Sequence, residues 1–322
     1  MHHQTPEPSE KPNPSLPRES ARSLTLDRFV QTYQTPGRPV IVTDLLHQWD
    51  WNLDYLSQQL GMQPFVLRYY GHERYQQDKR QWTSIGSGVP PKTRPFVDYA
   101  DLLRSREAHK NDIYMAKCSI HNTPLIQSEA IQTLQNYLEH IGLTHPASSL
   151  NLWVGPGGHV EALHYDPMDG TLVQLHGSKR VTLFPPSQTS NLYPFPLYVH
   201  LKHGMKLRSW FSQVYPNRPN FEAFPKLRQA LQHQYEVILN PGEMLYIPTG
   251  WWHEVESLGD EMVCSVNRFW RVYPTQRAVL SWQRWRTHLG SVCALPSVGV
   301  SLVKAALSRD RSQRFKEILQ IF

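Results

Sequence analysis

The middle of the chain is a succession of short apolar runs separated by turn-forming residues. Between Leu150 and Trp270 these runs are "LNLWVGPGG", "GTLVQLHGSKRVTLFPP", "QYEVILNPGEMLYIPTGWW" and "MVCSVNRFW". Short runs with a two-residue period, bounded by Gly, Pro and Asn, are typical of antiparallel strands. The pattern therefore predicts a mainly β protein with flanking helices, in which residues 150–273 form a sandwich or barrel.

The segments on either side of this region differ from it. Residues 1–22 are rich in Pro, Ser and Glu, a composition that predicts disorder. Residues 23–149 mix helical stretches such as "NLDYLSQQLG" with strand-like ones such as "DIYMAKCSI", and we expect these α/β elements to pack on the barrel. Residues 274–322 return to helical spacing, which predicts C-terminal helices.

These C-terminal helices have two amphipathic patterns. The first places Val279, Trp282, Trp285 and Leu289 on one helical face. The second is "VSLVKAALSRDRSQRFKEILQIF". Packing on the barrel would account for both patterns, and contact of "RFKEILQIF" with a membrane surface is an alternative.

Composition narrows the class of protein. Of the 322 residues, 40% are hydrophobic and 19% are charged, as in soluble globular proteins. The chain contains no run of about 18 apolar residues, so we expect no membrane span, and its polar N-terminus has no apolar signal core. Cys118, Cys264 and Cys293 are odd in number and far apart, which predicts free thiols and a cytoplasmic location.

The net charge of +6 raises the question of a nucleic-acid partner. The basic residues are scattered, however, and the densest group is "RDRSQRFK" near the C-terminus. The sequence has no zinc-finger spacing, RNA-binding signature or Gly-rich phosphate loop. We therefore expect no nucleic-acid partner, and the positive charge favours acidic partners instead.

Three side chains in the β region have the types that bind iron. His164 and Asp166 lie two positions apart in "ALHYDPMDG", so a strand would point both to the same side. His253, in "YIPTGWWHEV", would reach them from a second strand. Two imidazoles and one carboxylate on one face of Fe(II) leave the opposite face open for substrate and O2.

A second pair with the same spacing makes this choice ambiguous. "HVE" places His159 and Glu161 two positions apart, just before the first pair. The two pairs have opposite parity, so one continuous strand could not point both inward. Spacing alone therefore leaves the iron ligands open.

The surrounding sequence resembles a known family. The stretches "LHYDPMDGTLVQLHGSKRVTLFPPSQTSNLYPFP", "SQVYPNRPNFEAFP" and "VILNPGEMLYIPTGWWHEVESLGDEMVCSVNRFW" are similar to JmjC-type, cupin-fold 2-oxoglutarate oxygenases. The likeness begins near "PGRPVIVTDLLHQW" and is strongest to the hydroxylase branch, which includes the asparaginyl hydroxylase that inhibits hypoxia-inducible factor. It implies a double-stranded β-helix (cupin or jelly-roll) barrel, with residues 150–273 as a JmjC/cupin catalytic core.

The resemblance also implies site residues, position by position. It selects as iron ligands His164, Asp166 and His253. The lysine that pairs with the distal carboxylate of 2-oxoglutarate corresponds to Lys179, and a tyrosine bonded to the same carboxylate corresponds to Tyr114. An asparagine near the iron corresponds to Asn267. No further catalytic residue is implied.

The chain departs from the family pattern at two positions. Glu161 stands three residues before the first iron ligand, where the family usually has Thr or Ser. Gly170 stands six residues after it, where the family often has Asn. A carboxylate near 2-oxoglutarate would repel it unless paired with a basic group, so these positions make the cosubstrate geometry an open question.

The activity implied by the resemblance is Fe(II)- and 2-oxoglutarate-dependent hydroxylation, which consumes O2 and releases succinate and CO2. The substrate we favour is a side chain in a protein or peptide. Alternatives are a modified tRNA base, a small molecule, or a non-catalytic cupin that binds metal or ligand. Because related hydroxylases often pair through C-terminal helices, residues 274–322 are also a candidate for homodimerisation.

Overall fold

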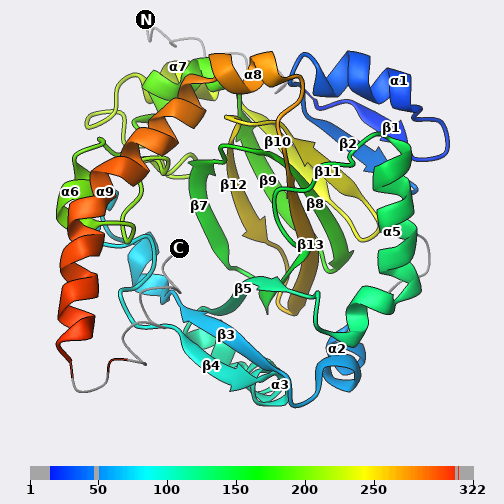
Figure 1. The fold of residues 1–322 in the computed structure, drawn as a ribbon, viewed down its shortest axis with the longest axis horizontal. Coiled ribbons are helices and arrows are strands. Elements are labelled where there is room, and N and C mark those ends of the chain that lie inside the picture. The colour runs from blue at the N-terminus through cyan, green and yellow to red at the C-terminus, as the bar shows by residue number, and fades with distance from the viewer. Residues whose placement is uncertain (1–14, 47–50, 309–310, 312–322) are drawn as a thin grey trace, which may run out of the picture.

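Two sheets packed against each other form the centre of the molecule (Figure 1), whose computed structural model describes residues 15–46, 51–308 and 311. The first sheet contains, in spatial order, β1 (Arg18–Ser20), β2 (Val40–Thr43), β11 (Met244–Ile247), β8 (Asp169–His176), β13 (Met262–Trp270), β6 (Asn151–Pro156), β5 (Ile113–Ser119), β3 (Pro64–Tyr69) and β4 (Lys92–Pro95). The second contains β10 (Tyr235–Leu239), β9 (Lys179–Phe184), β12 (Trp252–Ser257) and β7 (Val160–Tyr165).

The eight strands from β6 to β13 form a double-stranded β-helix. One sheet takes β6, β13, β8 and β11, and the other takes β7, β12, β9 and β10, so the chain crosses repeatedly between the sheets. All ladders among these eight strands are antiparallel. The prediction of a mainly β, cupin-like barrel with flanking helices is confirmed.

Strand parity decides what enters the space between the sheets. On β9, the alternate residues Lys179, Val181 and Leu183 are all buried, and the two apolar ones pack with Ile41 and Leu245 from the opposite sheet. Successive side chains of a strand point to opposite faces, so a lysine at the start of this row is carried into the barrel together with the core. The fold therefore places Lys179 inside.

Helices cover the outside of the barrel (Figure 1). They are α1 (Leu26–Phe29), α2 (Leu53–Leu60), α3 (Phe96–Arg104), α4 (Glu107–Lys110), α5 (Glu129–His140), α6 (Val199–His203), α7 (Leu227–Leu231), α8 (Thr275–Leu280) and α9 (Trp282–Ala306). In α5, the hydroxyl of Ser128 caps the first turn by accepting from the Ile131 N–H, and Ile131, Leu134 and Leu138 form one buried face.

The N-terminal segment is ordered where disorder was expected. Arg18–Ser20 pair in parallel with β2, and Leu16 is buried. The Arg18 guanidinium bonds the carboxylate of Glu243 and, at 3.0 Å, the carbonyl of Ile238. Composition could not predict this strand because it forms by pairing with β2, whose Ile41 lies opposite Arg18. Residues 1–14 lie outside the described part.

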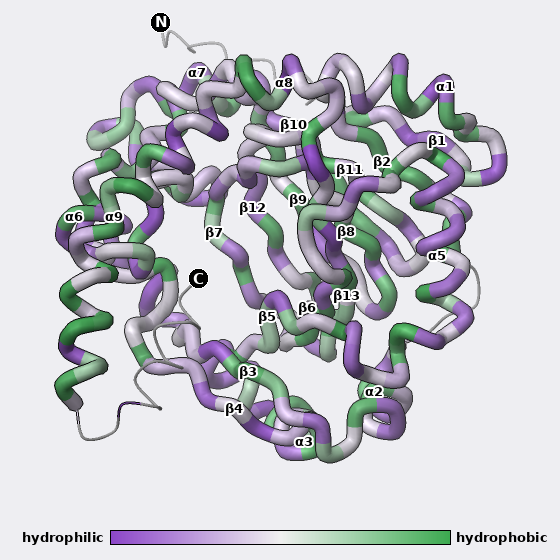
Figure 2. Tube along the Cα trace, in the orientation of Figure 1, coloured by the Kyte–Doolittle hydropathy of each residue, from purple (hydrophilic) through white to green (hydrophobic). Residues whose placement is uncertain are grey.

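Helix α9 packs on the barrel with its polar and small residues. Thr287, Gly290 and Ala294 are buried, and a Cβ on Gly290 would lie 2.6 Å from Nε2 of His200 in α6. The outer face of α9 is apolar, with Trp282, Trp285 and Leu289 between 43% and 56% exposed. Val279, predicted on the same helical face, lies on α8 instead, because the chain is extended at Ser281, and it is 57% exposed. That row therefore does not pack on the barrel, and Figure 2 shows hydrophobic segments recurring along the helix.

Within the described residues, α9 is the one helix that is long and apolar enough to cross a membrane. No membrane span was expected from the sequence, and this single candidate is weak evidence because length and composition are the only criteria it meets. The second amphipathic pattern continues α9 as far as Ala306, and residues 312–322 lie outside the described part.

Candidate metal centre

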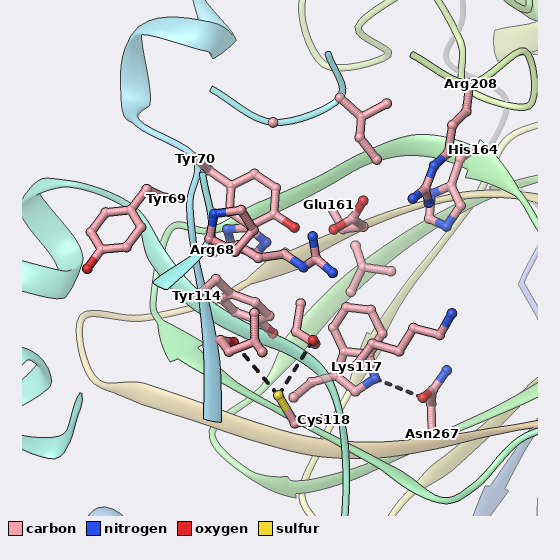
Figure 3. A pocket seen from close by; sticks show the side chains of 18 of the residues that line it. Arg68, Tyr69, Tyr70, Tyr114, Lys117, Cys118, Glu161, His164, Arg208 and Asn267 are labelled. Carbon is pink, nitrogen blue, oxygen red and sulfur yellow. Dashed lines mark hydrogen bonds between the residues drawn. The ribbon is translucent and has the colours of Figure 1, made fainter. Parts of the chain in front are cut away.

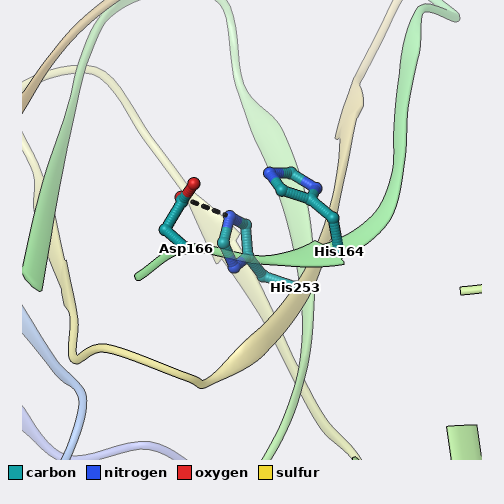
Figure 4. A group of neighbouring side chains, drawn as sticks. All are labelled: His164, Asp166 and His253. Atoms are coloured by element: carbon teal, nitrogen blue, oxygen red, sulfur yellow. Dashed lines mark ion pairs between the residues drawn. The ribbon is translucent and has the colours of Figure 1, made fainter. Parts of the chain in front are cut away.

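Two strands and the turn after one of them bring the three predicted iron ligands together. His164 lies on β7, Asp166 follows the end of that strand, and His253 on β12 is the direct cross-strand neighbour of His164. One ligand atom from each residue lies within 4.8 Å of the other two, and His253 Nε2 is 3.5 Å from Asp166 Oδ2 (Figure 4). In the described part of the chain this is the one such group of three donors.

Backbone carbonyls orient both imidazoles in the same way. Nδ1 of His164 lies 2.8 Å from the carbonyl oxygen of Ala162, and Nδ1 of His253 lies 3.1 Å from that of Trp251. An Nδ1–H that donates to a carbonyl leaves Nε2 with its lone pair, the form in which imidazole binds a metal. The ring of Phe211 stacks on His164 at 4.8 Å and fixes its plane.

The charges of the triad suit a divalent cation. Burial, and then repulsion from His253, lower the pKa of His164, which favours the neutral imidazole. Burial opposes ionisation of Asp166, but its hydrogen bond with His253 and the charges of His164, His253 and Lys117 together outweigh burial and lower the pKa of Asp166. Two imidazoles and one ionised carboxylate, each aimed at one point, form the donor set of non-haem Fe(II) oxygenases. The residues present therefore fit iron.

The competing pair does not form a metal site. His159 is buried, its Nδ1 lies 2.7 Å from Oδ1 of Asp112, and its ring stacks on Tyr114 at 3.8 Å. Glu161 nevertheless lines the same pocket as His164 (Figure 3). The parity argument fails because β7 bulges against β12 between Glu161 and His164, so it is not one continuous strand.

A cavity of about 1210 Å³ extends from the triad into the barrel. Lys179 lies in its wall, 3% exposed, with Nζ donating to Ser265 Oγ at 2.6 Å and to Tyr114 Oη at 3.3 Å. Burial lowers the pKa of Lys179 to about 8. An ammonium at this depth needs an anion, and one carboxylate of 2-oxoglutarate would supply it together with hydrogen bonds from the two hydroxyls.

Three residues support Lys179 and Tyr114 in a role that the sequence did not predict: Ser265, Asp112 and His159. Ser265 touches the lysine, and its place two residues before Asn267 on β13 puts it on the same strand face, a signal that parity could have provided. Asp112 is hydrogen-bonded to the imidazole of His159, and that imidazole stacks on the ring of Tyr114. No spacing in the sequence indicates that His159 stacks on Tyr114.

The remaining predicted residues also lie at the pocket. Tyr114 and Asn267 both line it. Oδ1 of Asn267 accepts from the indole N–H of Trp153 at 2.8 Å, which fixes the orientation of the amide (Figure 3). Gly170 lines the pocket too, and a Cβ there would make ordinary contact, 3.6 Å, with the ring of Phe269. Glycine at 170 therefore widens the pocket without being required by the backbone.

The two tryptophans of "GWWHEV" do not line this pocket. Trp252 is fully buried, packs edge-on against Tyr165, and donates its indole N–H to Thr189 Oγ1 at 3.0 Å. Trp251 is 8% exposed and donates to the carbonyl of Gly37 at 2.9 Å. Both tryptophans therefore pack in the hydrophobic core.

Comparisons with known proteins agree with this geometry. A model of the cupin-like domain family matches residues 26–276. The chain is 27% identical over 282 residues to lysine-specific demethylase JMJ31 of Arabidopsis thaliana, covering 77% of this chain and 49% of that protein. It is 27% identical over 270 residues to lysine-specific demethylase 8 of Danio rerio, covering 82% and 60%.

A third relative is named for two activities. The chain is 26% identical over 276 residues to the bifunctional arginine demethylase and lysyl-hydroxylase psr-1 of Caenorhabditis briggsae, covering 81% of this chain and 64% of that protein. The chain thus spans about half to two thirds of the length of the curated relatives it matches.

Proposed function

Because the chain belongs to the cupin-like domain family and has relatives of JmjC type, we propose that it is an Fe(II)- and 2-oxoglutarate-dependent oxygenase that hydroxylates a protein or peptide side chain. The observation that carries the proposal is the convergence of His164, Asp166 and His253 beside a pocket with a buried ammonium, Lys179. These are a metal site and an anion site in one cavity.

Each group of residues has a defined task in this proposal. The three ligands hold Fe(II) on one side and leave its other side to face the cavity. Lys179, Ser265 and Tyr114 hold the distal carboxylate of 2-oxoglutarate and so orient its other end toward the metal. Iron with 2-oxoglutarate supplies the activation of O2 and the oxidation of a C–H bond, and the protein supplies orientation and exclusion of side reactions.

The relatives are named both for demethylation and for hydroxylation, so their names do not decide between these two reactions. Demethylases and a lysyl hydroxylase both begin by oxidising a C–H bond, and they differ in whether the oxidised carbon is then lost from nitrogen. We propose stable hydroxylation, in line with the likeness to the hydroxylase branch. Mass spectrometry of a modified peptide distinguishes the outcomes, because hydroxylation adds one oxygen atom and demethylation removes a methyl group.

The test that needs no substrate is anaerobic visible absorbance of the protein titrated with Fe(II) and then 2-oxoglutarate. We expect a weak metal-to-ligand charge-transfer band that forms only with both, is absent in His164→Ala, and is retained in His121→Ala, an exposed histidine outside the pocket. Iron binding without this band would contradict the 2-oxoglutarate assignment and favour a non-catalytic metal-binding cupin. A modified tRNA base or small molecule remains the alternative substrate.

We also propose that α9 pairs with α9 of a second copy. Trp282, Trp285, Leu289 and Val292 follow the spacing of a coiled-coil seam and are all exposed. The helix is tied to the barrel by Gln283, which donates to the carbonyl of Pro186 at 3.0 Å. Such a tether favours a surface seam over a membrane span. A cytoplasmic location stays a prediction, supported by free Cys118, Cys264 and Cys293.

A further inference from the structure

The pocket around the triad has more positive charge than the cofactors need. Its lining holds five cations, namely Arg68, Lys117, Lys179, Lys206 and Arg208, against the two carboxylates Glu161 and Asp166. Fe(II) brings two positive charges and 2-oxoglutarate two negative ones, so loading both leaves the excess of three positive charges unchanged. The pocket therefore stays positive when both cofactors are loaded, which favours an anionic substrate.

Three of these cations come from three separate elements and lie close enough to affect one another. Arg68 is on β3, Lys117 on β5, and Arg208 in the segment between α6 and α7. Burial, and then the charge of Arg68, lower the pKa of Arg208. Burial, and then the charge of Arg208, lower the pKa of Lys117. Like charges held together in a cavity are costly unless an anion binds among them.

Local backbone geometry brings Lys117 to this point. Its φ is +56°, a region that side-chain-bearing residues rarely adopt, and the pairing of β5 with β6 shifts register between Met115 and Cys118. A bulge re-aims a side chain and is common next to active sites. A lysine kept in an unfavourable conformation inside a strand is an outlier that indicates a functional constraint.

The other two cations are placed beside the cosubstrate and iron residues. Arg68 pairs across the strands with Tyr114. Nε of Arg208 donates to the Met205 carbonyl at 3.2 Å, and the charge of Asp166 acts on both Arg208 and Lys117. Figure 3 shows Arg68 and Arg208 among the side chains that line the pocket with Glu161 and His164.

We propose that Arg68, Lys117 and Arg208 form a receptor for a carboxylate of the substrate, so that an acidic peptide side chain enters the pocket with its C–H bonds facing the iron site. This inference rests on the proposed function and names its substrate class. Guanidinium groups match the two oxygens of a carboxylate, and a lysine or arginine side chain would be repelled. Because the three cations line one pocket and lie close enough to affect one another, they suit a single acidic side chain better than an extended nucleic-acid backbone.

The test is calorimetric binding of three blocked peptides to protein loaded with Fe(II) and 2-oxoglutarate without oxygen. The peptides are acetyl-(Ala-Glu)₃-amide and its Gln and Lys counterparts. We expect the Glu peptide to bind at least tenfold more tightly than the Gln peptide, and the Lys peptide not to bind. Equal affinity for the Glu and Gln peptides, or tighter binding of the Lys peptide, would overturn the receptor.

Variants of the pocket cations test whether the Glu peptide binds at this place. Arg208→Gln and Lys117→Gln should each weaken the Glu peptide at least tenfold more than they weaken 2-oxoglutarate. Arg208→Lys should recover part of the affinity, because it keeps the charge but loses the planar guanidinium. Lys226→Gln, which removes an exposed cation outside the pocket, should change nothing. Equal losses for peptide and 2-oxoglutarate would mean that these cations serve the cosubstrate, which contradicts the proposal.

Two further results separate this inference from the proposed function. Oligouridylate that binds more tightly than the Glu peptide, and is lost in the same variants, would replace the peptide receptor by a nucleic-acid one. Selective Glu-peptide binding by a protein that never forms the 2-oxoglutarate absorbance band would leave the receptor standing and overturn the oxygenase. Formation of the absorbance band without peptide selectivity would support the oxygenase and overturn the receptor.

Discussion

The iron pocket and the outer face of α9 depart from the usual distribution of residues in opposite directions. The pocket holds buried polar groups, such as Lys179 at 3% exposure and His253 at 5%. The outer face of α9 holds exposed apolar ones, such as Val292 at 61% and Leu295 at 63%. Soluble proteins bury few charges and expose few contiguous apolar patches, so each region indicates something that binds there.

The difference between the two regions lies in how far the protein satisfies its own groups. In the pocket, neighbouring strands give the buried groups partners, since His253 has a backbone carbonyl and Lys179 has two hydroxyls. On the outer face of α9, the described residues offer the apolar side chains no cover. A small ligand can complete the first region, whereas the second needs a surface as large as another protein.

The largest expected effect is on α9. Leu289→Arg should weaken the proposed dimer at least 100-fold, because two copies of the change each remove about 1.5 kcal/mol or more of apolar burial. Sedimentation equilibrium measures the dissociation constant. Ser301→Arg, an exposed position on another face of the same helix, is the matched control and should leave the dimer intact. A wild-type protein that stays monomeric at all tested concentrations would contradict the proposed dimer.

The next effect concerns the metal. His253→Ala removes one of three ligands and should weaken Fe(II) binding by at least about 100-fold, since even changes behind the ligands cost 10- to 100-fold. Anaerobic equilibrium dialysis gives the affinity. His121→Ala should bind iron as the unchanged protein does. Unaltered iron affinity in His253→Ala would contradict the assignment of the triad as the metal site.

Replacing Lys179 tests whether this buried lysine serves ligand binding and not the stability of the protein. Lys179→Met should weaken 2-oxoglutarate about 10- to 100-fold, the worth of a charged hydrogen bond, while the unliganded protein becomes no less stable. Affinity comes from the absorbance titration and stability from urea unfolding.

A second buried lysine provides the control. Lys79 lies outside the pocket, fully buried, and donates to the Val214 carbonyl at 2.8 Å. Lys79→Met leaves the buried Glu254 without its cation, so we expect a loss of about 3 kcal/mol in the free energy of unfolding and little change in 2-oxoglutarate affinity. The reverse pattern in the two variants would show that the lysines had been assigned the wrong roles.

The smallest effect is on pH dependence. Burial lowers the pKa of Lys179 to about 8, whereas a bound carboxylate favours the charged ammonium. Below pH 8 the lysine is already protonated, and above it binding must take up a proton, so 2-oxoglutarate affinity should fall by up to about tenfold per pH unit. Absorbance titrations at pH 7, 8 and 9 give the slope. A slope that persists in Lys179→Met would have to come from another group.

The sequence predicted the parts of the molecule that depend on strand period. The short apolar runs correspond to barrel strands, and the spacing of His164 and Asp166 corresponds to two side chains on one side of a strand end. The two-residue period of a strand depends only on neighbouring residues, so it can be recognised in the sequence before the fold is known. Assigning His253 as the third ligand required the family resemblance, because cross-strand neighbours cannot be identified from one chain's spacing.

What the sequence could not predict depends on irregular backbone and on packing between distant segments. The bulge in β7 brings Glu161 and His164 to the same pocket, against simple alternation. The positive φ of Lys117 has no signal in "DIYMAKCSI". The stacking of His159 on Tyr114 joins residues 45 positions apart. Each feature is set by tertiary contacts that override local preference.

The position of β12 has a consequence for the order in which a newly made chain acquires its properties. β12 lies between β9 and β7, and β7, at the edge of that sheet, has β12 as its partner there. During synthesis the strand with His164 therefore emerges about 90 residues before the strand that holds it in place. Such long-range pairing is slow. The three iron ligands can therefore come together only after β12 has paired with β7, so iron binding would follow closure of this sheet.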